Sequence, residues 1–334
     1  MPVPDPTERP AVRSVRRIVA GAAAWLMSVA AGAGIIVRLT VQDHYHLPAI
    51  VFYMLSPASI LGCAGFAGVL FWLLGRNRNA ARMLLVAVAC VVWVGGTMFH
   101  FHPQAERSDQ SVRVLFWNVF RGHLGWDAIL DLIHDESPDI VVLAETGKPR
   151  VSKDFWTEYC PDYDHCATFP HQVVVLSKYP IDESAILHHS PQGFFGRLQL
   201  CIDRDKLALI VCDLPGNPWR RRSESTALLT ELAAEYSGTP AVIVGDMNTP
   251  VDSVYFDQLR TRFRNAFSLN GYGYHATWPM PLPVIAIDHC WVSHHIEVAA
   301  CSIKWTAGSD HRPIVADLII PATDDPGNDQ HVTD

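Results

Sequence analysis

Residues 241–248 are AVIVGDMN, an uncharged apolar run that ends in an acid and, two residues later, an amide. Small and β-branched apolar residues in such a run predict a buried strand. Asp246 and Asn248 stand two residues apart at its end, so we expect their side chains to point to the same side of the chain. Strand ends present side chains to clefts, and this stretch therefore predicts a polar site at the edge of a sheet.

Four more short motifs hold residues of the same kinds. Three of them accompany apolar runs, at 112–117, 140–144 and 284–287, that we expect to be strands. The run at 112–117 is followed by an amphipathic segment near 126–133 and then by the next strand, which is the opening of an α/β layer. The motifs are Trp117-Asn118, Ala144-Glu145-Thr146, Ile287-Asp288-His289 and Ser309-Asp310-His311.

These residue types suit the hydrolysis of a phosphoester. Attack of water places charge on the phosphoryl and leaving oxygens, and a hard cation held by carboxylates stabilises that charge. Glu145 and Asp310 are the candidate ligands for this cation. A second carboxylate with an amide beside it can take the proton from the attacking water, which suits Asp246 and Asn248.

The remaining pair consists of a histidine and an acid. His311 would bind the phosphate, provided that an acid keeps its imidazole charged or in the correct tautomer. We expect Asp288 to be that acid.

The ordered set of motifs resembles the endonuclease/exonuclease/phosphatase superfamily, the deoxyribonuclease-I-like hydrolases, over residues 111–320. GDMNTP at 245–250, HATWP at 275–279 and SDHRP at 309–313 are similar to a bacterial, often membrane-tethered branch of it. The resemblance implies an α/β fold, a two-sheet sandwich in four layers. It also implies hydrolysis of phosphoester bonds with Mg²⁺ or Mn²⁺.

The resemblance further implies a role for each motif residue. Asn118 and Glu145 would hold the metal and a phosphate oxygen, and Asp310 would be a further carboxylate on the metal side. Asp246 would be the base and Asn248 its orienting partner. The pair of Asp288 and His311 would bind the phosphate.

One position departs from the family pattern. The family usually has a His or Tyr that touches the phosphate after the strand expected at 207–212, and this chain has Asp213. A carboxylate facing a phosphate is repulsive unless a cation lies between them. Either Asp213 binds a second metal, or one of Arg220, Arg221 and Arg222 takes over the contact, or catalysis is weak. We expect Asp213 and Arg222 to contact the substrate.

The first hundred residues contain three uncharged apolar runs, at 18–37, 48–75 and 83–98. A bilayer core takes about 20 apolar residues per helix, so we expect about three transmembrane helices within residues 18–100. Four Arg precede the first run and three separate the second from the third, whereas Arg38 alone separates the first two. Because Lys and Arg stay in the cytoplasm, residues 1–17 should be cytoplasmic and the later domain outside. A cleaved signal peptide at the first run is the alternative.

Downstream we expect a linker at 101–110, a catalytic domain at 111–320 and an acidic disordered tail at 321–334. From Phe101 onward the chain has 18 Lys and Arg against 31 Asp and Glu, a formal net charge of −13. Nucleic-acid binders rely on basic surface. A nucleic acid is therefore a less favoured substrate than a small or lipid phosphoester.

The eight cysteines leave two alternatives open. Six of them lie beyond residue 100, and an even number in an oxidising compartment permits disulfides. Cys290 and Cys301 could face each other across a hairpin near His294. Ordinary buried thiols are the other interpretation.

The sequence thus predicts a multi-pass inner-membrane protein with a metal-dependent phosphoester hydrolase domain outside the cytoplasm. The bilayer and a phosphoester are its expected partners, and no protein partner follows from the residues. The alternatives are an extracytoplasmic nuclease and a weak or inactive binding domain at the membrane, the latter motivated by Asp213 alone.

Overall fold

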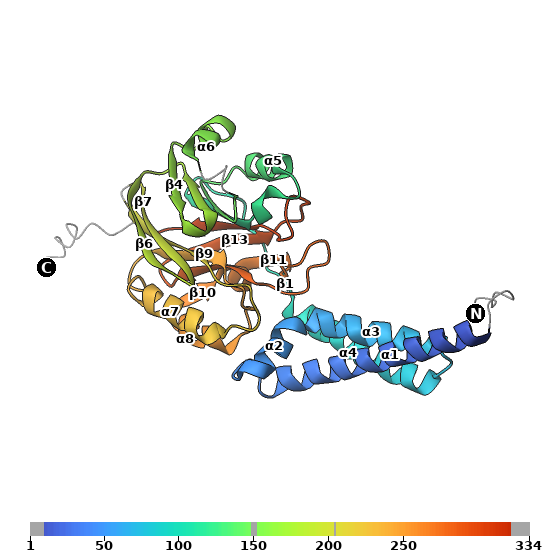
Figure 1. The fold of residues 1–334 in the computed structure, drawn as a ribbon. Coiled ribbons are helices and arrows are strands. Elements are labelled where there is room, and N and C mark those ends of the chain that lie inside the picture. The colour runs from blue at the N-terminus through green and yellow to red at the C-terminus, as the bar shows by residue number, and fades with distance from the viewer. Residues whose placement is uncertain (1–9, 148–151, 204, 322–334) are drawn as a thin grey trace. The chain divides into compact units, whose positions relative to one another are not determined.

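A computed structural model describes residues 10–147, 152–203 and 205–321 (Figure 1). The chain divides into two compact units, Met1–Met98 and Phe99–Asp334. Residues 1–9 of the expected cytoplasmic segment and residues 322–334 of the expected tail lie outside the described residues.

The N-terminal unit consists of helices α1 (Pro10–Leu39), α2 (His46–Met54), α3 (Pro57–Leu73) and α4 (Asn77–Thr97). In the described residues, α1 and α4 are each long and apolar enough to cross a membrane, and α2 and α3 pass that test only together. These two are bent by 68° relative to each other, so the span expected at 48–75 is a pair of helices rather than one continuous helix, and whether the pair crosses a membrane stays a prediction.

The bend has a local cause. Pro57 begins α3, and the Ser56 side chain caps it by accepting the N–H of Ser59 at 3.1 Å. A proline cannot continue the preceding helix, and a serine cap starts a new one. The guanidinium of Arg38 donates to the carbonyls of Phe52 and Leu55 at 2.8 and 2.7 Å, and so satisfies groups that the end of α2 leaves open.

The C-terminal unit contains an eight-stranded mixed sheet, which we call sheet A. Strands β2 and β3 are parallel, so their carboxyl ends meet, with Asn118 opposite Ala144. The spatial order is β1 (Phe99–Phe101), β11 (Gly271–Tyr274), β13 (Glu297–Ile303), β14 (Ile314–Ile319), β2 (Ser111–Asn118), β3 (Ile140–Ala144), β5 (Val173–Ser177) and β4 (His165–Phe169).

The second sheet, sheet B, has six strands. Strands β8 and β9 are parallel, with Asp213 opposite Asp246, and β12 runs antiparallel to β9, so that it begins where β9 ends. The spatial order is β10 (Phe263–Asn265), β12 (Asp288–Ser293), β9 (Ala241–Asp246), β8 (Asp205–Asp213), β7 (Gly193–Ile202) and β6 (Ile181–Ser190).

The two sheets pack face to face around the largest apolar core, which includes Val114, Val142, Leu209 and Val244. Helices α5 (Trp126–Glu136) and α6 (Lys153–Tyr159) cover the outer face of sheet A. Helix α7 (Arg222–Ala234), the 3₁₀ turn η4 (Val254–Phe256) and α8 (Asp257–Arg260) cover that of sheet B. The short helix α9 (Ala266–Asn270) follows β10. The predicted two-sheet α/β sandwich is confirmed (Figure 1).

Three local expectations were wrong. Residues 284–287 are not a strand: the Thr277 hydroxyl accepts the N–H groups of Ile287 and Asp288, and regular pairing starts only at Asp288. Phe101, expected in the linker, belongs to β1 and pairs with β11. Cys290 and Cys301 lie in different sheets rather than across a hairpin, and all eight cysteines are free thiols.

Candidate active site

The predicted site residues gather where strands of both sheets end. Asn118 closes β2, Glu145 follows β3, Asp246 closes β9, and Asp288 opens β12 directly opposite Asp246. Gly245 lets β8 and β9 approach, because a Cβ there would lie 2.1 Å from the carbonyl oxygen of Cys212. The topology thus explains why residues far apart in sequence meet at one edge of the sandwich.

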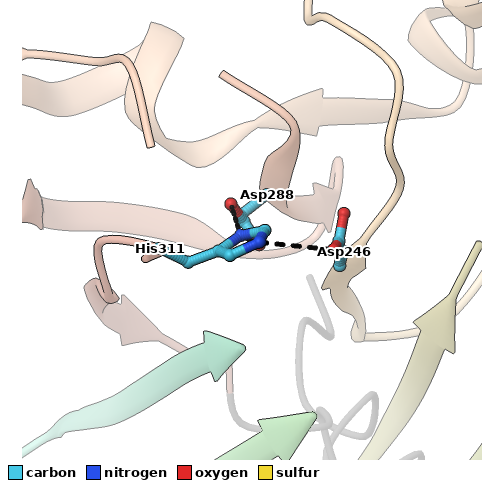
Figure 2. A group of neighbouring side chains, drawn as sticks. All are labelled: Asp246, Asp288 and His311. Carbon is cyan, nitrogen blue, oxygen red and sulfur yellow. Dashed lines mark hydrogen bonds and ion pairs between the residues drawn. The ribbon is translucent and has the colours of Figure 1, made fainter. Parts of the chain in front are cut away.

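Asp246, Asp288 and His311 form a compact buried group (Figure 2). Nδ1 of His311 lies 2.9 and 3.1 Å from the two carboxylate oxygens of Asp288, and Nε2 lies 3.9 Å from Oδ2 of Asp246. The ring therefore stands between two carboxylates, held by one and facing the other.

This arrangement sets the protonation of the group. Burial alone would lower the pKa of His311, but the charge and hydrogen bond of Asp288, with the charges of Asp246 and Asp310, raise that pKa to about 10. Burial, then the charge of Asp288, raise the pKa of Asp246 well above its usual range, and His311 opposes that shift. A bound cation nearby would favour the ionised carboxylate of Asp246.

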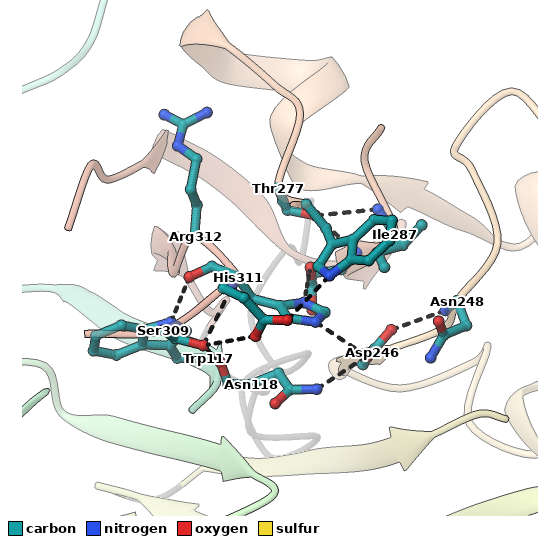
Figure 3. A network of polar contacts seen from close by, with 12 residues as sticks. Trp117, Asn118, Asp246, Asn248, Thr277, Ile287, Ser309, His311 and Arg312 are labelled. Atoms are coloured by element: carbon teal, nitrogen blue, oxygen red, sulfur yellow. Dashed lines mark hydrogen bonds and ion pairs between the residues drawn. The ribbon is translucent and has the colours of Figure 1, made fainter. Parts of the chain in front are cut away.

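Asn118 connects the proposed base Asp246 to the proposed metal ligand Glu145, and Figure 3 shows its contact with Asp246. Its amide nitrogen donates to Oδ2 of Asp246 at 3.1 Å and lies 3.2 Å from Oε1 of Glu145, while its Oδ1 accepts the N–H of Phe120. An amide that is only 1% exposed and donates to two carboxylates holds both at a fixed separation.

Asn248 acts on Asp246 differently from the expectation. Its backbone N–H, not its amide, donates to Oδ1 of Asp246 at 3.0 Å (Figure 3). The amide donates instead to the carbonyl of Leu214 at 2.8 Å. Asp246 therefore receives one hydrogen bond on each oxygen, from Asn248 and from Asn118, which fixes the plane of its carboxylate.

Oxygen atoms that suit a hard divalent cation are present. The Glu145 side chain is 34% exposed, with Oε2 3.9 Å from Nε of Arg121. Asp310 accepts a hydrogen bond from Nε1 of Trp278 at 3.2 Å. In the described residues, Asp246, Asp288 and His311 also offer ligand atoms within 4.8 Å of one another. A protonated His311 would oppose a cation in that group, so the carboxylates of Glu145 and Asp310 are the better fit.

Several residues that we did not predict support the site. The Ser309 hydroxyl donates to the Asn118 carbonyl at 2.7 Å and accepts the N–H of His311 at 3.1 Å. Nε1 of Trp117 donates to the His311 carbonyl at 2.9 Å (Figure 3). Ser309 and Trp117 stood inside the quoted motifs, but nothing in their spacing distinguished a supporting residue from a structural one.

The loops of the site contain unusual backbone. Nine non-glycine residues in the described ranges have positive φ, and six of these lie at the ends of strands that form the site. Residues held in this region cost free energy and cluster at functional sites. The six are Phe120, Arg121, Glu145, His171, Gln172 and Asn248.

The two residues expected to contact substrate have other neighbours. Oδ2 of Asp213 lies 2.9 Å from Nδ1 of His171, a residue without a predicted role. Arg222 is 4% exposed, and its guanidinium donates to the carbonyl of Pro215. Arg222 is thus a buried residue that contacts the segment after β8, and its expected contact with the substrate stays a prediction.

A comparison with protein families matches residues 115–311 to the endonuclease/exonuclease/phosphatase family. The chain belongs to this family, and it is an enzyme that hydrolyses phosphoester bonds, a class in which dependence on divalent metals is general. Among curated protein sequences, none is similar enough to count as a match.

Solved structures share the fold at low identity. The human Nocturnin catalytic domain with bound sulfate anion is 18% identical, with a TM-score of 0.53 over 65% of this chain and 96% of that one. A mannosyl-6-phosphatase from Bacteroides thetaiotaomicron is also 18% identical, with a TM-score of 0.52 over 63% and 100%. An endonuclease/exonuclease/phosphatase family protein from the same organism is 17% identical, with a TM-score of 0.51 over 65% and 100%.

Proposed function

We propose that this chain is a membrane-anchored phosphoester hydrolase, dependent on Mg²⁺ or Mn²⁺, that acts outside the cytoplasm on a small or lipid phosphoester. The observation that carries the proposal is the buried set of Asp246, His311 and Asn118. The carboxylate of Asp246 faces Nε2 of His311. The amide nitrogen of Asn118 lies within hydrogen-bonding distance of both Asp246 and the proposed metal ligand Glu145.

The roles follow from this geometry. Asp246, oriented by Asn118 and Asn248, takes the proton of the attacking water. His311, kept charged by Asp288, donates to a phosphoryl oxygen and stabilises the negative charge that develops there. Glu145, Asp310 and the Asn118 oxygen would hold a divalent cation, which supplies Lewis-acid stabilisation of the phosphoryl group when bound.

Exposed apolar side chains on loops that join the strands of the site favour a substrate with an organic or lipid part. Phe120 follows Asn118 by two residues and is 38% exposed, Trp219 lies on the loop after β8 and is 67% exposed, and Leu282 lies on the loop before Asp288 and is 79% exposed. Trp278, which donates to Asp310, is 37% exposed. Exposed apolar groups around a polar site are typical of surfaces that bind apolar partners.

The membrane and topology parts of the proposal rest on α1 and α4, on the bent pair α2–α3, and on the distribution of Arg between them. If the bent pair crosses once, the chain crosses three times and the unit from Phe99 onward lies outside. We place the protein in the cell inner membrane on this basis.

A substrate panel tests the choice among substrates. The full-length protein in detergent micelles would be offered phospholipid, sugar-phosphate, nucleotide and single-stranded or duplex DNA substrates with Mg²⁺ or Mn²⁺, and Asp246→Asn would be the matched control. We expect turnover of a lipid or small phosphoester above that of DNA at moderate salt. Preferential cleavage of DNA would favour the nuclease alternative, for which the net charge of −13 from Phe101 onward is unfavourable.

A further inference from the structure

A second pair of a histidine and an acid joins the two sheets. His171 belongs to the 3₁₀ turn η3 (Pro170–Gln172), which lies between β4 and β5 of sheet A, and Asp213 is the last residue of β8 in sheet B. Nδ1 of His171 lies 2.9 Å from Oδ2 of Asp213. His311 and Asp288 have the same relation, with the histidine between two strands of sheet A and the acid on sheet B.

Strand pairing and hydrogen bonds to backbone carbonyls connect both members of this second pair to the site. Asp213 lies opposite the proposed base Asp246 in the register of β8 and β9, and the N–H of Leu214 donates to the Asp246 carbonyl at 2.8 Å. On the other sheet, the Gln172 carbonyl accepts both the N–H and the hydroxyl of Thr146, each at 3.0 Å. Thr146 follows the proposed metal ligand Glu145 directly, so the pair stands beside both functional groups.

The ring of His171 is oriented and accessible. Because Nδ1 faces Asp213, a protonated ring directs its Nε2–H away from that carboxylate. The side chain is 33% exposed, and the rings of Phe194 and His189 lie 6.0 and 5.3 Å from it between centroids. His171 and Gln172 have φ of 60° and 61°, a conformation that non-glycine residues adopt at a cost.

Protonation of His171 would remove the conflict at Asp213. A lone carboxylate would repel a phosphate, whereas a carboxylate bound to an imidazolium has no net charge and presents a hydrogen-bond donor beyond it. The hydrogen bond to Asp213 raises the pKa of His171 against the effect of burial, and the charges of Asp213 and Glu145 act in the same direction.

We propose that His171 is a second substrate-binding residue, which donates Nε2–H to a non-bridging oxygen of the phosphoryl group, and that Asp213 is its positioning residue. The inference rests on the proposed function. The family pattern expects the histidine on the strand that here ends in Asp213, and this chain supplies it from the opposite sheet.

Two substitutions separate phosphate binding from a structural role. His171→Asn keeps an amide nitrogen near the position of Nδ1, so it can still bind Asp213 but cannot reach the phosphate. His171→Gln places its amide near the position of Nε2 and should bind the phosphate better than Asn does. His189→Asn, in the neighbouring ring, is the matched control.

The measurements are the affinity for inorganic phosphate by calorimetry and steady-state kinetics on bis(para-nitrophenyl) phosphate, using the full chain in detergent with Mn²⁺. We expect His171→Asn to weaken phosphate binding and kcat/KM by about tenfold or more, the effect of losing one charge-assisted hydrogen bond. His171→Gln should lose less, and His189→Asn should match the wild type.

Exchanging the two residues provides an independent check. His171→Asp alone places two carboxylates together and should be the weakest variant. The double variant His171→Asp with Asp213→His restores the pair in the opposite order and should recover most of that loss, if its melting temperature shows that it folds.

The outcomes separate the two proposals. Wild-type turnover combined with unchanged phosphate affinity in His171→Asn, or equal losses in the Asn and Gln variants, would overturn the role of His171 alone. A wild type that neither binds phosphate nor turns over any phosphodiester would overturn the proposed function and this inference with it.

Discussion

Nδ1 of His311 lies 2.9 Å from Oδ2 of Asp288, and this contact leaves the other ring nitrogen, Nε2, to interact with a substrate. The ring is held by its Nδ1 edge, so Nε2 points toward Asp246 and the space beside it (Figure 2). An acid that holds a histidine in this way sets both its orientation and its charge.

The two residues should therefore behave as a unit in kinetics. We expect His311→Ala to lower kcat/KM by roughly 100-fold to 10,000-fold, and Asp288→Asn to lower it less, because Asp288 acts through its neighbour. The double variant should be close to His311→Ala alone. Multiplicative losses in this double-mutant cycle would show that Asp288 acts independently of His311.

Glu145→Gln tests the proposed metal ligand. The substitution preserves the shape of the side chain and its distance from Asn118 but removes the charge that attracts a cation. We expect the Mg²⁺ concentration for half-maximal activity to rise and maximal turnover to fall by orders of magnitude. Normal turnover of the variant at low Mg²⁺ would remove Glu145 from the ligand set.

We expect the burial of His289 to make the free energy of unfolding depend on pH. Its side chain is 2% exposed, and burial lowers its pKa to about 4, although its hydrogen bond to the Thr249 carbonyl opposes the shift. In the unfolded chain a histidine binds a proton below about pH 6.5. The unfolded state then holds more protons, so the free energy of unfolding falls as the pH falls from 6.5 toward 4, by about 1.4 kcal/mol per pH unit for this residue.

Thermal unfolding of the full chain in detergent between pH 7 and pH 4.5 measures this effect. His289→Gln keeps a donor for Thr249 but does not titrate, so its melting temperature should decline less steeply with acid than that of the wild type. Identical slopes for the two proteins would mean that His289 is not held neutral by the fold.

Reporter fusions test the topology. A reporter fused after Phe101 should behave as exported and one fused after Arg78 as cytoplasmic, because the loops contain four, one and three Arg in order. The test also decides whether α2 and α3, which are bent by 68° relative to each other, together cross the membrane. If the pair enters and leaves on one side, the chain crosses twice, and the fusion after Phe101 would be cytoplasmic.

The strands that form the centre of both sheets could be predicted because they are buried on both faces. Ile140–Ala144 is a continuous apolar run, Ala241–Asp246 is one up to its final acid, and all residues of both strands are buried. In contrast β6, with exposed and half-buried residues throughout, has no such run and was not predicted. Burial on two faces leaves a signal in the sequence that a solvated edge strand lacks.

The identity of the main site residues was easier to predict than the hydrogen bonds that orient them. The motifs pointed to Asp246, Asp288 and His311, which do come together, but His171 stands in a short turn with no local pattern. It is 42 residues away from Asp213 in sequence. Likewise Asn248 orients Asp246 through its backbone, and a residue type says nothing about which of its groups will be used.

The most direct test of the account is the hydrolysis of bis(para-nitrophenyl) phosphate by the full chain in detergent, with Mg²⁺ or Mn²⁺ and with a chelator, for the wild type and Asp246→Asn. We predict turnover that requires the metal and that falls by roughly 100-fold or more in Asp246→Asn, while the melting temperature shows that the variant is folded. Turnover that is insensitive to the chelator, or that is equal in the wild type and Asp246→Asn, would contradict the assignment of Asp246 as the base of a metal-dependent hydrolase.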